Sequence, residues 1–183
     1  MTLETNRLLL RPWQESDAAA LYRYASDPAV GPIAGWPVHT SVENSLEIIR
    51  SVLSAPETYA VVLKETNEAV GSIGLKLQGS SGLVSSLDEA ELGYWIGVPY
   101  WGQGLIPEAA ELLLCYGFET LGLTKIWCAC YAGNEKSRRV QEKCGFTLVS
   151  TQENISCPLL GEVRTEVVSA LTRDQWRTNQ NRK

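Results

Sequence analysis

Two spacings of apolar residues succeed each other along the chain. Alternation of apolar with polar or small residues predicts strands, and it occurs at residues 7–11, 58–64, 70–78, 90–98, 125–131, 146–151 and 163–171. Helical spacings of apolar residues occur at residues 18–25, 42–53, 107–121 and 134–145. Because strands and helices are interspersed, the sequence predicts an α/β (α+β) fold, a mixed sheet with helices packed on its faces.

Glycine, proline and polar residues separate these elements. Residues 31–39 are too rich in glycine and proline for regular structure, and residues 79–86 are expected to be a flexible loop. A polar connection is expected between the last two strands. No linker or repeat interrupts the chain, so residues 1–176 are predicted to be a single domain, followed by a frayed, disordered tail at residues 177–183.

The segment from Trp101 to Gly104 joins a predicted strand to a predicted helix. Gly102 and Gly104 carry no Cβ, so a ligand can approach the backbone closely. Pro107 suits the first turn of a helix, whose N–H groups have no intrahelical partner and, with the helix dipole, attract a phosphate or pyrophosphate. Because a glycine pair before a helix is also common in surface turns, this motif alone leaves the function open.

Composition excludes several classes of protein. The net charge of −5 and the pI near 5.0 argue against a nucleic-acid-binding protein. Five cysteines without a Cys-x-x-Cys motif, and His39 as the one histidine, predict neither a disulfide framework nor a metal site. Cys128 and Cys130 share one strand face and are expected to be small buried residues. No export signal and no apolar stretch of about 18 residues is visible, so we expect a cytoplasmic protein without a membrane span.

Four motifs occur in order along the chain. They are Thr5-Asn-Arg-Leu-Leu-Leu-Arg11, Leu92-Gly-Tyr-Trp-Ile-Gly97, Trp101-Gly-Gln-Gly104 with Glu108 and Ala109, and Asn134-Glu-Lys-Ser137 running into Lys143-Cys-Gly-Phe146. Together they resemble the GNAT superfamily of acyl-CoA-dependent N-acetyltransferases, in particular its ribosomal-protein-alanine acetyltransferase subgroup. The resemblance implies a single GNAT-type domain with a mostly antiparallel sheet of about seven strands and about four helices. It also implies acetyl-CoA as cosubstrate and no metal.

The same resemblance implies which residues hold coenzyme A. The pyrophosphate would lie on the backbone of the glycine loop, here Trp101, Gly102, Gln103, Gly104, Leu105 and Ile106. The pantetheine arm would bind backbone groups of Ile96 and Val98, where the strand separates from its neighbour. Asn134 would lie near the pantetheine and Ser137 near the thioester sulfur. Ile106 departs from the family, which usually has Gly or Ala there, so the fit of the loop to the phosphates is in question.

The implied reaction needs a proton acceptor, an oxyanion donor and a proton donor. Glu91 is the candidate general base, acting directly or through water, because it faces away from the apolar row of its strand. The backbone N–H near Ile96 is a candidate oxyanion donor, and Ser137 a candidate proton donor to the leaving thiolate. Direct transfer requires no covalent enzyme intermediate. The structural alternatives are a solvated carboxylate at Glu91 and a plain helix cap at Asn134.

In the subgroup that the chain resembles, the segment that corresponds to residues 31–39 lies near the acceptor entrance. Trp36, His39 and Trp95 are therefore candidate acceptor-binding residues. The alternatives are an exposed loop histidine and packing aromatics.

The sequence leaves two functions open and disfavours a third. The first is an N-acetyltransferase acting on a primary amine, either a protein N-terminus or a small-molecule amine. The second is an acyl-CoA-binding or regulatory module of the same fold without turnover. A dinucleotide-binding domain lacks the third glycine and the acidic partner of that fingerprint. The oligomeric state is also open, a homodimer included.

Overall fold

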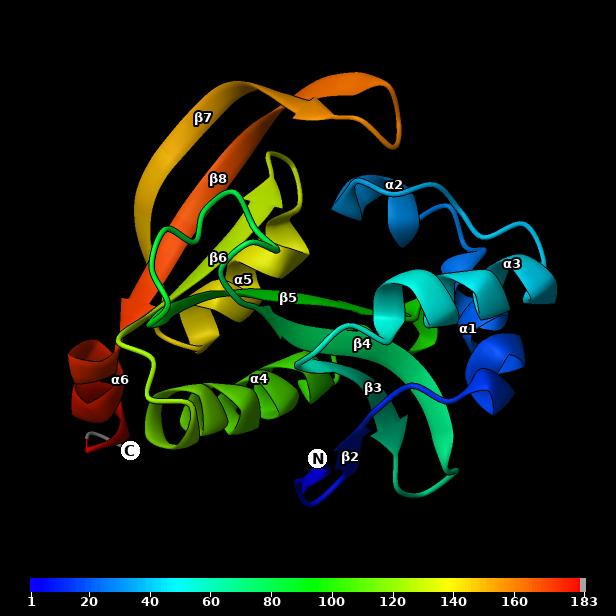
Figure 1. Ribbon diagram of the computed structural model, residues 1–183, viewed down its shortest axis with the longest axis horizontal. Coiled ribbons are helices and arrows are strands. Elements are labelled where there is room, and N and C mark those ends of the chain that lie inside the picture. Colours follow the sequence, from blue (N-terminus) through cyan, green and yellow to red (C-terminus); the bar gives the residue numbers. More distant parts are fainter. Residues whose placement is uncertain (182–183) are drawn as a thin grey trace. The chain divides into compact units, whose positions relative to one another are not determined.

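The computed structural model describes residues 1–181, and these form two compact units. The first comprises residues 1–74 and 94–112, and the second comprises residues 75–93 and the chain from residue 113 onward. The strands are β1 (Leu3–Glu4), β2 (Leu8–Arg11), β3 (Thr58–Leu63), β4 (Glu68–Lys76), β5 (Glu89–Ile96), β6 (Lys125–Tyr131), β7 (Thr147–Cys157) and β8 (Glu162–Thr172) (Figure 1). The α-helices are α1 (Ala18–Ala25), α2 (Gly31–Ala34), α3 (Val42–Ile48), α4 (Leu105–Cys115), α5 (Glu135–Lys143) and α6 (Arg173–Gln180).

Hydrogen bonding orders the described strands as β1-β2-β3-β4-β5-β6-β8-β7, and β4 and β5 each contribute residues to both units. The pairs β1–β2, β2–β3, β3–β4, β6–β8 and β7–β8 are antiparallel, and β5–β6 is parallel. The predicted α/β class with a mixed, mostly antiparallel sheet is therefore confirmed.

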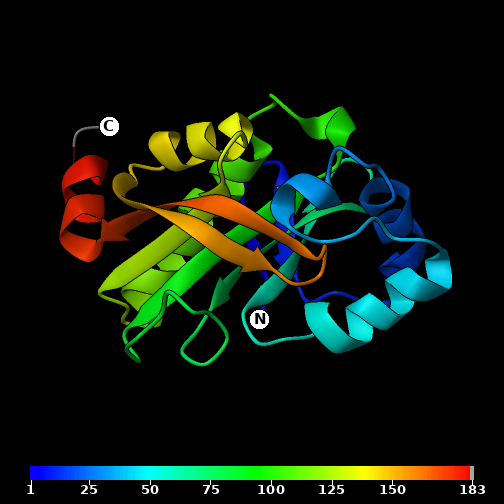
Figure 2. The same ribbon diagram turned by 90° about the horizontal axis from the view of Figure 1, so that it is seen from above.

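In the first unit, the helices α1 and α3 lie side by side (Figure 1 and Figure 2). Helix α1 buries Ala18, Leu21 and Ala25, which the helical spacing of three and four residues places on one face. Their side chains belong to one buried cluster that also contains Val62 of β3 and Ala69 of β4. This apolar stripe, as the sequence predicts, is what holds the helix in place.

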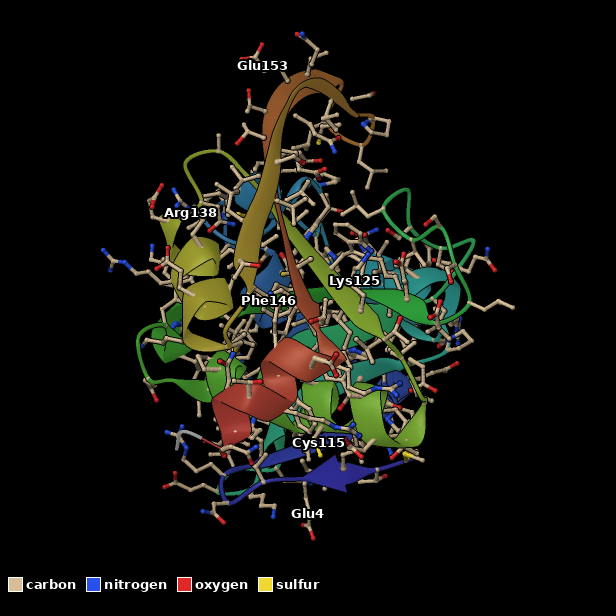
Figure 3. All side chains as sticks on the ribbon, turned by 90° about the vertical axis from the view of Figure 1, so that its left-hand side faces the viewer. Glu4, Cys115, Lys125, Arg138, Phe146 and Glu153 are labelled. Carbon is tan, nitrogen blue, oxygen red and sulfur yellow. The ribbon has the colours of Figure 1, made fainter. Side chains whose placement is uncertain are left out.

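In the second unit, β5 and β6 pair over only three register positions, from Glu89↔Lys125 to Glu91↔Trp127. Strand β6 instead runs its full length beside β8, as far as Tyr131↔Glu166. The hairpin β7–β8 is long, and β7 bends at a bulge beside Glu153 (Figure 3). The end of the parallel pairing at Glu91 agrees with a strand that leaves its neighbour there.

Every predicted strand and helix is present, and several boundaries differ. The prediction that residues 31–39 lack regular structure is wrong, because Gly31–Ala34 form α2, closed by Gly35 at φ +92°. The prediction that the helix after the glycine loop begins at Pro107 is also wrong. Helix α4 begins at Leu105, and Pro107 is tolerated because N–H groups of the first turn have no intrahelical acceptor.

The C-terminal end differs most from the sequence-based expectation. The polar connection after residue 151 is largely strand, because β7 continues to Cys157. The frayed tail expected from residue 177 is helical through Gln180, and residues 182–183 lie outside the described part. A capping box between Thr172 and Gln175 begins α6, and Trp176 packs against Phe118 with the two ring centroids 5.4 Å apart. These contacts order a segment whose composition alone is too polar to predict it.

Candidate functional site

The glycine loop lies in the first unit, between a 3₁₀ turn at Val98–Tyr100 and the start of α4. Gly102 and Gly104 have φ values of +76° and +75°, in the left-handed region that favours glycine. A Cβ built on Gly102 would meet no heavy atom of the described residues within 4 Å. The loop therefore presents bare backbone beside a helix N-terminus, an arrangement that can bind an anion.

The side chains of Trp101 and Gln103 close the loop on its own backbone. Trp101 Nε1 donates to the carbonyl of Ile96 at 2.9 Å, and Trp101 N donates to the carbonyl of Val98 at 3.1 Å. Gln103 Nε2 donates to the carbonyl of Pro99 at 2.9 Å. Strand β5 ends at Ile96, so the expectation that Val98 continues the strand is wrong. Because the carbonyl oxygens of Ile96 and Val98 each accept a hydrogen bond from Trp101, a ligand would bind the N–H groups of these residues or the second lone pair of each carbonyl oxygen.

Leu105 and Ile106 follow the loop with their side chains inside the protein. They are 2% and 5% exposed. Because the Ile106 side chain is buried, it does not stand on the outer surface of the loop, where phosphates would approach. The departure from Gly or Ala at this position thus gives no geometric reason against anion binding.

The N-terminal segment also holds the loop. Arg7 Nη1 donates to the carbonyl of Gln103 at 3.1 Å, and Arg7 Nη2 lies 2.6 Å from Glu108 Oε2 in the first turn of α4. Sequence reasoning did not assign these residues to the site. Arg7 belongs to the motif at residues 5–11 and Glu108 to the motif of the glycine loop, but the sequence does not reveal that the two residues contact each other.

Glu91 lies in the second unit, on β5, at the position where the parallel pairing with β6 ends. Its side chain is 14% exposed. Lys76 Nζ lies 3.0 Å from Glu91 Oε1, and Ser81 Oγ donates to Glu91 Oε2. The alternative of a freely solvated carboxylate is therefore wrong. Each of these contacts uses one lone pair of a carboxylate oxygen, so each oxygen keeps a second lone pair that can accept a proton from water or from an acceptor amine.

Glu89 lies two residues before Glu91 on β5. Glu89 is 8% exposed and accepts from Trp127 Nε1 at 3.1 Å and from Lys125 Nζ at 3.1 Å. Burial opposes the charged form of Glu89, but these donors outweigh it and hold its pKa below the usual value. We assign Glu89 to structure rather than to the site.

Glu166 on β8 is a carboxyl group that the sequence did not bring forward. It is partly buried and lies opposite Tyr131 of β6. Burial, reinforced by the negative charge of Glu91, raises the pKa of Glu166, and Lys76 opposes this shift. Its proximity to Glu91 depends on long-range strand register, so a local sequence pattern could not have identified it.

Asn134 and Ser137 lie at the start of α5 in the second unit. Asn134 Oδ1 accepts from the backbone N–H of Ser137 at 3.2 Å, so Asn134 does cap the helix. Gln141 Nε2 lies 3.5 Å from Ser137 Oγ, and Gln141 is 3% exposed. Burial raises the pKa of the nearby Cys130 thiol, and hydrogen bonds with Ser137 and Gln141 oppose this shift. The Ser137 hydroxyl is thus part of a small polar network.

Trp36, His39 and Trp95 come together in the first unit. The ring of Trp36 lies 5.5 Å from His39 and 5.7 Å from Trp95, between centroids. His39 is 8% exposed and its Nδ1 lies 2.8 Å from Ser45 Oγ, so the alternative of an exposed loop histidine is wrong. Burial lowers the pKa of His39. Trp36 and Trp95 pack on the buried cluster of this unit and retain partial exposure.

The predicted site residues thus form two groups, each described within its own unit. The first unit holds the glycine loop, Ile96 and the aromatic group, and the second unit holds Glu91, Asn134 and Ser137. Among the described residues, no group of three or more His, Cys, Asp or Glu side chains is placed to hold a metal ion. No helix in residues 1–181 is both long and apolar enough to cross a membrane. Chemically, the residues supply an anion site, a carboxylate and a hydroxyl.

Comparison with known proteins gives consistent matches. A family model described as an acetyltransferase (GNAT) domain matches residues 7–147. The uncharacterized N-acetyltransferase p20 of Bacillus licheniformis is 30% identical over 150 residues, which are 79% of this chain and 82% of that protein.

Solved structures agree with these matches. The crystal structure of an acetyltransferase (GNAT family) from Bacillus anthracis has a TM-score of 0.81 and 26% identity, over 95% of this chain and 99% of that one. The ribosomal-protein-S5-alanine acetyltransferase of Vibrio fischeri has a TM-score of 0.73 and 19% identity, over 96% and 98% of the two chains. This last match shows likeness of fold alone.

Proposed function

The chain belongs to the family of GNAT-domain acetyltransferases, and on that premise we propose that it moves an acetyl group directly from acetyl-CoA to a primary amine in a ternary complex. Family membership makes it an acetyl-CoA-dependent N-acetyltransferase. The direct route and the acceptor, a protein N-terminus or a small-molecule amine, are the parts that we propose.

The observation that carries the proposal is the glycine loop. Its left-handed Gly102 and Gly104 expose backbone at the N-terminal end of α4, which supplies N–H groups and a positive dipole end. We propose that Trp101, Gly102, Gln103, Gly104, Leu105 and Ile106 hold the pyrophosphate of coenzyme A through this backbone. Buried side chains at Leu105 and Ile106 would keep the loop in one conformation.

For the pantetheine arm we propose backbone groups of Ile96 and Val98, together with Asn134 and Ser137. Capping of α5 uses the amide oxygen of Asn134, and a ligand would then use the amide nitrogen. Ser137 would donate its hydroxyl proton toward the departing thiolate. A free thiol of this kind has a pKa of about 8.5, so the proton need be only partly transferred as the bond breaks.

Glu91 is the proposed general base, acting directly or through one water. An α-amino group, with a pKa of about 8, needs less help from such a base than a lysine side chain at about 10.4. The amine attacks the thioester carbonyl, the backbone N–H near Ile96 stabilises the oxyanion, and collapse expels the thiolate. Glu91 takes up the amine proton. Because the amine attacks the thioester directly, no acetyl group is attached to the enzyme.

Trp36 and Trp95 are proposed to line the acceptor site, with His39 holding Trp36 by its ring contact at 5.5 Å. Partly exposed indole rings can accept a cationic or apolar acceptor. We also propose, from composition, that the protein is cytoplasmic and binds neither nucleic acid nor a membrane. Whether it forms a homodimer is tested by size-exclusion chromatography.

Calorimetry with acetyl-CoA, followed by release of free thiol with a panel of amines, tests the function. The panel contains peptides with a free N-terminus, peptides whose only amine is lysine, and small amines. Binding with amine-dependent thiol release is expected. Tight binding without transfer to any amine would favour an acyl-CoA-binding module, and absence of binding would remove the proposal.

The base is tested with Glu91→Gln, and Glu162→Gln serves as a matched control, because Glu162 is the first residue of β8 and its side chain is 52% exposed. We expect Glu91→Gln to lower kcat by about 10²-fold or more and to change the pH profile of the rate. Glu162→Gln should resemble the wild type. An unchanged rate-pH profile in Glu91→Gln would exclude Glu91 as the base.

A further inference from the structure

Arg7 makes contacts of two kinds with the end of the glycine loop. Its Nη1 donates to the carbonyl of Gln103 at 3.1 Å, inside the loop itself. Its Nε donates to Glu108 Oε2 at 2.7 Å and its Nη2 lies 2.6 Å from the same oxygen. Thr5 Oγ1 donates to the other oxygen of Glu108. A single guanidinium therefore ties the loop backbone to the first turn of α4.

The tie joins segments that are far apart in sequence. The backbone N–H of Arg7 donates to Glu108 Oε1 at 3.2 Å across a separation of 101 residues. Thr5 Oγ1 in turn accepts from the N–H of Leu8 at 2.9 Å, at the start of β2. The loop thus gains support from a strand of the first unit, which the loop's own hydrogen bonds do not provide.

The charges of this cluster also bear on an anion. Glu108 lies in the first turn of α4, where a carboxylate would compete with a phosphate for the positive end of the helix dipole. Burial opposes its charged form, yet the hydrogen bonds from Thr5 and Arg7 hold its pKa below the usual value, so it is an anion at neutral pH. Arg7 neutralises this negative charge beside the loop.

We propose that Arg7 is a positioning residue that holds the glycine loop in its anion-binding conformation, and that it also keeps the charge of Glu108 from repelling a phosphate. This inference rests on the proposed function, because it assigns the loop to the pyrophosphate of coenzyme A. It adds that affinity for the cofactor depends on a side chain from the N-terminal segment, outside the loop and its helix.

The two partners have unequal roles in this scheme. In Arg7→Gln the loop loses its tie to Gln103 and the charge of Glu108 is unpaired, so coenzyme A should bind about tenfold more weakly. In Glu108→Gln the guanidinium keeps its bond to the Gln103 carbonyl and adds a positive charge, so the affinity should change by no more than about twofold to threefold. In Arg7→Lys the charge remains but the forked geometry is lost, which predicts an intermediate value.

A matched control exists in the same unit. Arg50 Nε and Nη2 each donate to one carboxylate oxygen of Glu15 at 2.8 Å, on the surface, with side chains 57% and 62% exposed. Neither residue takes part in the proposed site. Arg50→Gln should leave the affinity for coenzyme A unchanged, and its melting curve shows what the loss of an exposed ion pair alone does to stability.

The experiment is calorimetric titration of the wild type and these variants with coenzyme A, at about 0.05 and about 0.5 M salt, with melting curves for each. We expect the order Arg7→Gln, Arg7→Lys, Glu108→Gln from weakest to tightest, and a smaller Arg7→Gln defect at high salt, where repulsion is screened.

The outcomes separate this proposal from the one on which it rests. If the wild type does not bind coenzyme A, the assignment of the loop is wrong and this inference falls with it. If the wild type binds and Arg7→Gln binds equally well, only the positioning role is wrong. If Arg7→Gln does not fold, Arg7→Lys provides the test. Unchanged affinity for coenzyme A in Arg7→Lys would overturn the positioning role of the forked guanidinium of Arg7.

Discussion

Replacing Gly102 with alanine tests the glycine loop most directly, because the chain provides a glycine of the same backbone conformation elsewhere. Gly102 has φ +76°, and Gly122, which follows the helical segment ending at Thr120, has φ +73°. A Cβ on either would meet no described heavy atom within 4 Å. Gly102→Ala and Gly122→Ala therefore impose the same backbone strain without a clash.

The cost in stability follows from the conformation alone. A non-glycine residue in the left-handed region costs roughly 1–2 kcal/mol. Reduced freedom of the unfolded chain partly offsets this, since alanine has fewer accessible conformations than glycine. For a chain of 183 residues, a net loss of about 1 kcal/mol corresponds to a fall of about 2–4 °C in Tm. Both variants should show it equally.

Only Gly102→Ala should lose affinity for coenzyme A. Its methyl group would stand in the open space through which a phosphate reaches the loop, and losing one charge-assisted hydrogen bond costs roughly 1.5–3 kcal/mol. That range corresponds to a Kd raised about tenfold to about 150-fold.

The assay is calorimetric titration with coenzyme A, with melting curves of all three proteins. If Gly102→Ala and Gly122→Ala lose the same Tm and bind coenzyme A equally tightly, the proposed role of the loop backbone is refuted.

Three other predictions concern titration and the α5 start. Burial and Glu91 raise the pKa of Glu166, so its ionisation destabilises the folded state as pH rises through that pKa. Glu166→Gln should therefore raise Tm by roughly 2 °C near pH 7 and leave it unchanged below a pH of about 4, as measured by melting curves at a series of pH values. A gain in Tm that does not depend on pH would contradict the raised pKa of Glu166. Burial lowers the pKa of His39, so the folded state should lose stability as the pH falls below about 6.5, the ordinary pKa of histidine. His39→Asn should flatten this dependence in melting curves against pH, and equal slopes in the two proteins would show that His39 is not the group responsible. Ser137→Ala retains the cap, whose donor is a backbone N–H, so Tm should stay within about 2 °C while acetyl transfer from bound acetyl-CoA slows, and an unchanged rate would exclude the proton-donor role.

Much of the fold could be predicted because periodicity acts over short distances. The β3–β4 hairpin and α1 follow from patterns within a dozen residues, and both are present where the patterns lie. The segments that escaped prediction are short or polar, such as β1, α2 and α6. Their order comes from caps and from contacts such as Trp176 on Phe118, which composition does not reveal.

The candidate site was predictable to the extent that its geometry is local. The left-handed glycines of the loop and the cap of Asn134 on Ser137 involve residues within three positions of each other. The environment of Glu91 was not predictable in this way. Its contact with Lys76 and its influence on Glu166 arise from strands whose register is set by the whole unit.

The sequence by itself therefore determined the order of the longer strands and helices, the glycine loop ahead of α4 and the motifs that identify the family. All of these depend on backbone conformations that neighbouring residues select. Only the tertiary structure decided that His39 is buried against Ser45, that Lys76 pairs with Glu91 and that Arg7 ties the loop to Glu108. The last of these joins residues 101 positions apart, and such contacts form only once packing and strand register have brought distant segments together.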